Sequence, residues 1–312
     1  MLTLNKTALG GPTVALYSCF TAGDGVDEAA LGRLVDFYLR KGVKSLYVCG
    51  STGEGLLMSV EERKRTLEAV AEAAGGRMSL IVHVGANATR DAVALAAHSA
   101  TVRGVAAVSA IPSVYYRYPE RSIEAHWDAI MAASDLPFII YNIPQLCGYD
   151  MTPGLFRRML RREKVAGIKD SAVSVQQTRF FKSEGGPDFM VFNGPDEQYL
   201  AGRAMGADGG IGGTYGVMPE LFLGLERLFV AGRIAEASEL QQRINEIIEG
   251  LLAFPSLYGA AKAVMALRGV EIGGPRAPFE PVAAGDADKL RLLRDRIEAE
   301  VARYEAKAEG RA

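Results

Sequence analysis

The stretch VAGIK at residues 165–169 decides how this chain is expected to fold. Its apolar residues indicate a buried β-strand, and Lys169 ends that strand with an amine. A second apolar run, PFIIY at residues 137–141, ends in Tyr141. A lysine alone at a strand end usually extends its amine to water, whereas a buried neutral amine can attack a ketone. Two reactive side chains at the ends of core strands therefore favour amine chemistry on a carbonyl substrate.

Short apolar runs alternate with longer amphipathic segments along most of the chain. Residues 31–39 are one such segment, with apolar side chains at helical spacing and Gly42 as a stop signal. Parallel strands need helical crossovers, and eight strand–helix repeats suit closure into a barrel. We therefore predict an α/β fold, a (β/α)8 TIM barrel, with a doubly wound open sheet as the alternative. The eight predicted strands are residues 13–18, 45–49, 79–84, 105–110, 137–141, 165–169, 190–193 and 209–211.

After the eighth predicted strand the pattern becomes helical. Pro219 is well placed for the first turn of a helix. Apolar stripes at helical spacing then follow at residues 234–251 and 290–304. We expect residues 1–232 to form the barrel and residues 233–312 to form a C-terminal helical extension packed on it.

Composition narrows the class of protein. The chain has 312 residues, 49% apolar and 23% charged, with a net charge of −2, which is ordinary for a globular protein and disfavours nucleic-acid binding. Its three cysteines, Cys19, Cys49 and Cys147, are widely spaced, which favours a reducing, cytoplasmic location. No apolar run approaches the roughly 18 residues of a membrane span, and the N-terminus lacks the apolar segment of a signal peptide. Neither a membrane nor nucleic acid is therefore an expected partner.

The carboxyl ends of barrel strands meet on one face, where active sites of this fold lie. After the second strand, GSTGE at residues 50–54 presents Ser51 and Thr52 between glycines. Such a turn can bind a carboxylate through hydroxyl and backbone N–H groups, although it is also typical of an ordinary connection. After the seventh strand, Asp196 and Glu197 could bind a polyol. Asp196 could also cap a helix at residues 198–205, a role that would not exclude contact with the ligand.

Motifs for metals and nucleotide cofactors are not found in the sequence. His83, His98 and His126 lie far apart and form no HExxH pair, so no metal is expected. No Walker loop, GxGxxG or GxSxG motif occurs, so no cofactor is expected either.

Three motifs in this order are similar to one family. GSTGE at residues 50–54, YNIP at residues 141–144 and GIK at residues 167–169 resemble the dihydrodipicolinate synthase / N-acetylneuraminate lyase family. The resemblance runs from about residue 13 to about residue 281. It implies a (β/α)8 barrel, a homotetramer and a class I aldolase mechanism.

The resemblance also implies roles for individual residues. Lys169 corresponds to the lysine that forms the Schiff base, and Tyr141 to the tyrosine that transfers protons beside it. Ser51 and Thr52 correspond to the pair that binds the 2-oxo acid carboxylate and links to the tyrosine. Tyr115, or Tyr116 if the register differs by one, corresponds to an aromatic residue that completes a neighbouring subunit's site.

One position favours the lyase branch of the family. Synthases usually have an arginine five residues after the tyrosine of YNIP, where this chain has Leu146, which cannot bind a carboxylate. Lyases have leucine there, and their Asp-Glu pair, which binds sugar hydroxyls, corresponds to Asp196 and Glu197. The segments NGPDE at residues 193–197 and GADGGIG at residues 206–212 also resemble the lyases.

Other positions differ from the lyase pattern. Pro195 replaces a common tyrosine, Gly213 replaces a serine that would contact the sugar, and Ser171 replaces a threonine. These changes put N-acetylneuraminate itself in doubt and leave the pyruvate chemistry intact. Gly194 and Gly212 could allow close backbone approach to the substrate.

The sequence thus predicts a metal-independent enzyme that cleaves a 2-oxo-3-deoxy sugar acid, N-acetylneuraminate-like, into pyruvate and an aldehyde. The expected partner is the small-molecule 2-oxo acid substrate. One alternative is a dihydrodipicolinate synthase that condenses pyruvate with aspartate semialdehyde. A sugar-acid dehydratase of the same family and a catalytically silent binding barrel are further alternatives.

Overall fold

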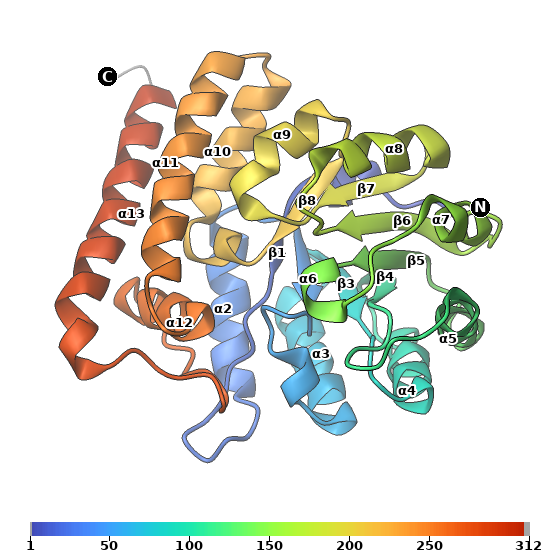
Figure 1. Cartoon of the computed structure of the whole chain (residues 1–312). Coiled ribbons are helices and arrows are strands. Elements are labelled where there is room, and N and C mark those ends of the chain that lie inside the picture. Colours follow the sequence, from blue (N-terminus) through green and yellow to red (C-terminus); the bar gives the residue numbers. More distant parts are fainter. Residues whose placement is uncertain (1, 309–312) are drawn as a thin grey trace.

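The computed structural model describes residues 2–308 and contains eight parallel strands that close into a barrel (Figure 1). Closure occurs where β1 pairs with β2 on one side and with β8 on the other. The predicted α/β fold and (β/α)8 barrel are therefore confirmed, and the open sheet is excluded. The strands are β1 (Gly11–Ala15), β2 (Ser45–Val48), β3 (Ser79–His83), β4 (Val105–Ala110), β5 (Phe138–Asn142), β6 (Val165–Asp170), β7 (Met190–Asn193) and β8 (Gly209–Gly212).

Helices follow the strands and surround the barrel (Figure 1). The chain signals their ends locally: Ser59 and Glu62 form a reciprocal capping box at the start of α3, and Pro219 opens α10. The helices of this part are α1 (Lys6–Leu9), α2 (Glu28–Arg40), α3 (Val60–Ala74), α4 (Thr89–Ser99), α5 (Glu120–Ala132), α6 (Pro144–Cys147), α7 (Pro153–Met159), α8 (Val175–Gly185), α9 (Tyr199–Ala204) and α10 (Pro219–Val230), with 3-10 turns η1 (Gly55–Leu57), η2 (Asp196–Gln198) and η3 (Thr214–Val217).

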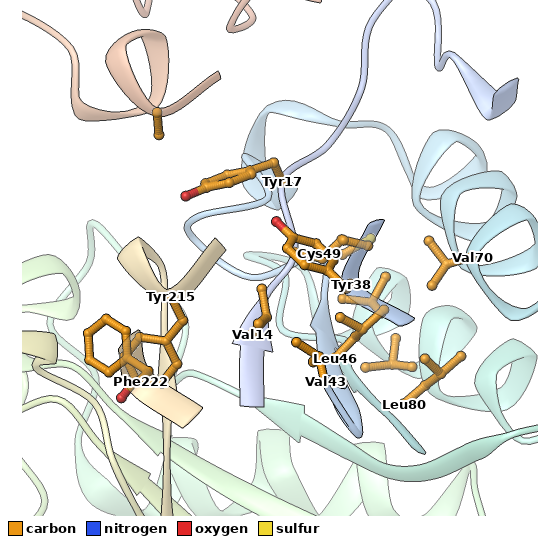
Figure 2. Close-up of a cluster of buried hydrophobic side chains, with 14 of the residues drawn as sticks. Val14, Tyr17, Tyr38, Val43, Leu46, Cys49, Val70, Leu80, Tyr215 and Phe222 are labelled. Carbon is orange, nitrogen blue, oxygen red and sulfur yellow. The ribbon is translucent and has the colours of Figure 1, made fainter. Parts of the chain in front are cut away.

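Strand alternation divides the core into two clusters. One contains side chains such as Tyr47 and Ile139, which point into the barrel, and the other lies between the sheet and the helices. Figure 2 shows part of the outer cluster, where Leu46 of β2 and Leu80 of β3 gather with Val70 of α3. Because Ile168 belongs to the outer cluster, the next residue along β6 points into the barrel.

The C-terminal helices pack along one side of the barrel beside α10 (Figure 1). They are α11 (Ile234–Leu252), α12 (Leu257–Leu267) and α13 (Ala287–Ala308), with the turn η4 (Ala284–Asp286) before α13. The contact between α10 and α13 is close, because the ring of Tyr304 occupies the space that a side chain on Gly224 would need. The expected boundary at residue 232 stays a prediction, and residues 309–312 of the expected extension lie outside the described residues.

The helices of residues 2–308 differ in length and apolar character. No single one is long and apolar enough to cross a membrane. The bent pair α11 and α12, whose axes differ by 110°, passes by length and composition only. Both helices bury apolar side chains within the protein, including Leu240, Ile244 and Val264.

Candidate active site

Lys169 lies at the carboxyl end of β6, inside the barrel. The strand register places it between Tyr141 of β5 and Phe192 of β7. Its side chain is 6% exposed, and Nζ lies 4.2 Å from the ring centroid of Tyr141 and 4.7 Å from that of Tyr47. Within residues 2–308, Nζ has neither an ion-pair partner nor a hydrogen-bond partner. The amine therefore stays in the barrel interior and faces two aromatic rings.

Ser51 and Thr52 lie in the turn between β2 and α3. The turn is tight: the N–H of Gly55 donates to the carbonyl of Gly50 over 3.0 Å, and a side chain on Gly55 would collide with the carbonyl oxygen of Cys49. Glycine at this position therefore lets the backbone fold back on itself. This geometry leaves both hydroxyl side chains half-buried at the barrel mouth.

Glu54, the last residue of the GSTGE motif, anchors this turn to the C-terminal part of the chain. Its carboxylate is buried, forms an ion pair with Lys262 Nζ of α12 at 2.6 Å and accepts the backbone N–H of Arg276 at 2.7 Å. Neither Lys262 nor Arg276 was predicted from the sequence as part of the site. A lone lysine within the apolar α12 sequence was the available signal for the first of them.

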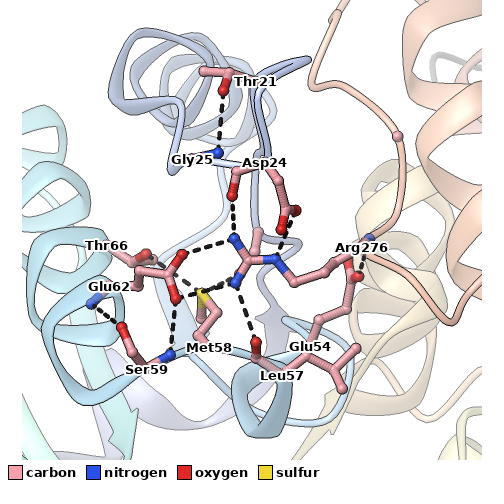
Figure 3. Close-up of polar contacts among 12 residues, drawn as sticks. Thr21, Asp24, Gly25, Glu54, Leu57, Met58, Ser59, Glu62, Thr66 and Arg276 are labelled. Carbon is pink, nitrogen blue, oxygen red and sulfur yellow. Dashed lines mark hydrogen bonds and ion pairs between the residues drawn. The ribbon is translucent and has the colours of Figure 1, made fainter.

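The Arg276 guanidinium joins three further segments, as Figure 3 shows. It donates to Asp24 Oδ1 at 2.9 Å, to the Leu57 carbonyl at 3.1 Å and to Glu62 Oε1 at 2.7 Å. The hydrogen bond from Arg276 is the main reason why the pKa of Glu62 is lowered. The loop before α13 therefore fastens the connections that follow β1 and β2.

Asp196 does not cap a helix, and that prediction was wrong. It is the first residue of η2, and no side-chain cap is present there. Its carboxylate instead accepts the backbone N–H of Thr214 at 2.7 Å and the hydroxyl of Thr214 at 2.6 Å, which tie β7 to the turn after β8. Burial raises the pKa of Asp196 to about 6. Gly212 leaves room for this carboxylate, because a side chain there would collide with Asp196 Oδ1.

A cavity of about 670 Å³ lies at the barrel mouth. Lys169 is the only cation and Glu197 the only acid among its described lining residues. Seven predicted site residues share its wall: Ser51, Thr52, Tyr141, Lys169, Ser171, Gly194 and Glu197. Asp196 and Gly212 lie behind this wall.

Tyr115 lies away from the cavity. It is 88% exposed, has a φ of 78°, and its ring packs edge-on against Tyr116 at 5.0 Å between centroids. Tyr116 is also exposed and lies outside the cavity wall. Within this chain neither tyrosine therefore reaches Lys169.

Further residues of the cavity wall were missed by the sequence analysis. Leu257 and Tyr258 come from α12, so the C-terminal helices form part of the site. Gln145 donates to the carbonyl of Ser171 over 3.0 Å and supports the loop after β6. Burial is the main cause that raises the pKa of Tyr258 to about 12, with smaller contributions from Tyr141 and Glu54. No sequence motif marks these positions, since each depends on how a helix docks.

His83 of β3 is buried beside the two rings that face Lys169. Its ring centroid lies 5.9 Å from that of Tyr141 and 6.1 Å from that of Tyr47. Burial and the nearby Arg63 charge lower the pKa of His83 well below its ordinary value, so His83 is neutral near pH 7. Across the described residues, no group of three or more His, Cys, Asp or Glu side chains is arranged to hold a metal ion.

These features define a (β/α)8-barrel protein with a buried lysine at the carboxyl end of β6. Residues 8–296 match the sequence model of the Dihydrodipicolinate synthetase family, and the chain belongs to this family. The resemblance noted in the sequence is thereby confirmed.

Individual relatives agree with the lyase branch. The chain is 41% identical to the N-acetylneuraminate lyase of Mediterraneibacter gnavus over 281 residues, which cover 89% of each chain. It is 40% identical to the N-acetylneuraminate lyase of Rhizobium meliloti over 283 residues, which cover 91% of this chain and 93% of that protein. The wild-type sialic acid aldolase of Ruminococcus gnavus superimposes with a TM-score of 0.92 at 38% identity, covering 96% of this chain and 99% of that one.

Proposed function

We propose that this chain is a class I carbon–carbon lyase that cleaves a 2-oxo-3-deoxy sugar acid, N-acetylneuraminate-like, to pyruvate and an aldehyde sugar. The main observation in support is the amine of Lys169, which has no ion-pair partner among residues 2–308 and lines the same cavity as Tyr141. A buried amine without a carboxylate partner breaks no ion pair when it loses its proton and attacks a carbonyl. The relatives named N-acetylneuraminate lyase and sialic acid aldolase support the substrate class.

In the proposed mechanism the substrate carboxylate binds at Ser51 and Thr52, which presents the C2 ketone to Lys169. The amine attacks C2, and Tyr141 transfers protons as water leaves and the Schiff base forms. The cationic imine accepts the electrons of the C3–C4 bond when that bond breaks. The resulting enamine takes up a proton at C3, and hydrolysis of the iminium then releases pyruvate and regenerates the lysine.

The polyol end of the substrate is assigned to the opposite wall of the cavity. Glu197 is exposed there and Ser171 contributes a hydroxyl. Gly194 leaves room for that hydroxyl, because a side chain at Gly194 would collide with Ser171 Oγ. Asp196 is proposed to act on the polyol through the backbone it fixes, since its Oδ2 is used by Thr214.

The charge of the cavity wall favours a lyase over a synthase. Aspartate semialdehyde would bring a second carboxylate, and among the described lining residues no cation besides Lys169 could bind it. Leu146 lines the wall where synthases usually have arginine. A neutral aldehyde sugar meets no such penalty. The synthase is therefore a second candidate. The dehydratase is kept as another second candidate.

We also propose a cytoplasmic homotetramer. All three cysteines are buried and free, as suits a reducing compartment. Tyr115 and Tyr116 expose much apolar surface to water, and a second copy of the chain would cover it. Mass photometry of the wild-type chain and of Tyr115→Ser measures this: we expect tetramers that dissociate in the variant, and a monomeric wild type would reject the assembly.

Borohydride trapping with pyruvate tests the proposed mechanism. Intact mass should show one reduced pyruvyl adduct per chain, and peptide mapping should place it on Lys169. Lys169→Arg, which keeps a positive charge but offers no nucleophile at neutral pH, is the matched control and should give no adduct. An adduct on another lysine would reject the assignment, and an intact fold without any adduct would favour a silent binding barrel.

A substrate panel separates the remaining candidates. Pyruvate release from N-acetylneuraminate and shorter sugar acids is expected, and condensation with aspartate semialdehyde is not. Activity should survive a chelator, because no step in the mechanism requires a metal. Strong loss of activity with the chelator would instead favour a metal-dependent class of enzyme.

A further inference from the structure

Two aromatic ring faces meet at the Lys169 amine. Tyr47 and Tyr141 lie with ring centroids 5.9 Å apart and ring planes at 84°, so they form a corner around Nζ. A cation within about 6 Å of a ring face is attracted by the negative charge of that face. This corner can therefore stabilise a positive charge on nitrogen without a carboxylate.

Tyr47 is fixed in this position from the other side. It is fully buried, and its hydroxyl donates to Ser109 Oγ at 3.0 Å in β4, which is separated from β2 by β3. The hydroxyl is therefore engaged by Ser109, and Nζ lies over the ring face of Tyr47. Tyr47 is not among the residues that line the cavity, so it does not act by binding the substrate.

We propose that the ring face of Tyr47 is a catalytic element that stabilises the cationic iminium formed on Lys169. The proposal rests on the proposed function and adds a residue that neither the sequence motifs nor the cavity wall identify. Tyr141 has its proton-transfer role besides its ring, whereas Tyr47 contributes through its ring alone.

The charge changes along the reaction show where this face acts. The neutral amine and the ketone first form a neutral carbinolamine, which takes up one proton and loses one water to give the iminium. On cleavage the C4 hydroxyl gives its proton to Tyr141, which gave one up when water left, and its O–H electrons form the aldehyde C=O bond. The C3–C4 electrons become the C2=C3 bond, and the C=N electrons return to nitrogen. The product enamine is neutral, so among these covalent states the iminium alone has a cationic nitrogen for the ring to stabilise.

The groups around the corner support this interpretation. His83 lies beside both rings and is neutral near pH 7, so it adds no positive charge of its own. The buried Arg63 guanidinium, 3.5 Å from His83 Nδ1, donates to the carbonyls of Gly85 and His83. A carboxylate at the position of Tyr47 would bind a buried ammonium much more strongly than a ring face does. A ring face stabilises the charge and still allows nitrogen to become neutral in the next step.

The test varies the charge of the ring face at constant shape. Residue 47 is changed to phenylalanine (Tyr47→Phe) or, by amber suppression, to pentafluorophenylalanine, whose ring face is positive. At saturating pyruvate and limiting borohydride, the initial rate of adduct formation on Lys169 reports the iminium population. We expect Tyr47→Phe to stay within about twofold of wild type and the fluorinated ring to lower the rate about tenfold.

Two further variants separate the effect of the ring face on the trapping rate from the effect of disturbed core packing. Tyr47→Leu removes the ring and should lower the rate as the fluorinated ring does. Tyr38→Leu removes a buried tyrosine of α2 elsewhere in the core and should leave the rate unchanged. If Tyr47→Leu does not fold, the phenylalanine and pentafluorophenylalanine pair decides by itself.

Equal trapping rates for that pair would overturn the role of Tyr47 and leave the proposed function intact. A folded wild-type chain without any pyruvyl adduct would overturn both. The two failures are thus distinguishable in one experiment.

Discussion

Two buried lysines differ in what surrounds them. Lys262 is 1% exposed and is paired with Glu54 at 2.6 Å, while Lys169 is 6% exposed and faces two rings without any ion pair among residues 2–308. A buried ion pair fixes geometry, because both charges lose stabilisation when they separate. An amine without a carboxylate partner breaks no ion pair when it forms a covalent bond. The comparison suggests that polar groups with partners build this site and that polar groups without partners perform its chemistry.

Replacing Lys169 tests the unpaired side of the comparison and has the largest expected effect. Lys169→Met should lower turnover by more than about 10³-fold, because the nucleophile is lost. Its free energy of unfolding should stay the same or rise by about 1 kcal/mol, since an apolar side chain of similar length replaces a buried unpaired amine. Turnover assays and urea unfolding measure both quantities. A clear loss of stability would show that the amine has a structural partner after all.

Lys262→Met tests the paired side. It leaves the Glu54 carboxylate buried without its cation, so the free energy of unfolding should fall by about 3–5 kcal/mol. The apparent affinity for pyruvate should also fall, because the turn that presents Ser51 and Thr52 loses its anchor. Urea unfolding and pyruvate titration measure these changes.

The double variant Glu54→Gln/Lys262→Met is the control for this prediction. It removes both charges and should recover most of the stability that the single variant loses. If single and double variants were equally stable, the ion pair would have no structural role. Pyruvate affinity would then have to depend on other contacts, such as those of Arg276.

The sequence predicted the barrel and the pair Lys169 and Tyr141 because both follow from local patterns. Apolar runs locate the strands, and residues at the carboxyl ends of neighbouring parallel strands must lie side by side. The register bears this out, since Tyr141 and Lys169 are direct partners. Ser51 and Thr52 reach the cavity wall for the same reason.

Contacts between distant loops could not be predicted in this way. Arg276 binds Glu54 across 222 residues, and nothing near either residue in the sequence indicates that contact. Asp196 shows the same limit in another form. Its position before a helix favoured a local cap. The carboxylate instead accepts two hydrogen bonds from Thr214, which is 18 residues further along the chain. Tertiary partners decided both cases.

Asp196→Asn tests a carboxyl group that is intermediate between Lys262 and Lys169. Asp196 is buried and hydrogen-bonded, but it has no ion-pair partner among residues 2–308. Its pKa is raised from 3.8 to about 6, so the fold favours the protonated form. That contribution to stability is complete below about pH 4 and is lost as the pH rises through about 6. Relative to Asp196→Asn, the free energy of unfolding of the wild type should fall by up to about 3 kcal/mol over this range.

Urea unfolding of both chains at several pH values measures the difference. Asp170, whose pKa burial also raises to about 6, is present in both chains, so its contribution cancels. A constant difference between pH 4 and pH 7 would show that Asp196 does not titrate in this window.

Tyr258→Phe has the smallest expected effect and compares two hydroxyl groups. The hydroxyl of Tyr258, which lines the cavity, has no protein partner within residues 2–308, whereas Tyr17 donates to the Gly213 carbonyl at 2.7 Å. Loss of one hydrogen bond to the substrate should raise KM about three- to tenfold in Tyr258→Phe, with little change in stability. Tyr17→Phe should instead lower the free energy of unfolding by about 1 kcal/mol, because a carbonyl of the barrel mouth loses its donor. Steady-state kinetics and urea unfolding of both variants provide the test. If Tyr258→Phe lost stability and kept its KM, a hydroxyl without a protein partner would not mark a substrate contact in this site.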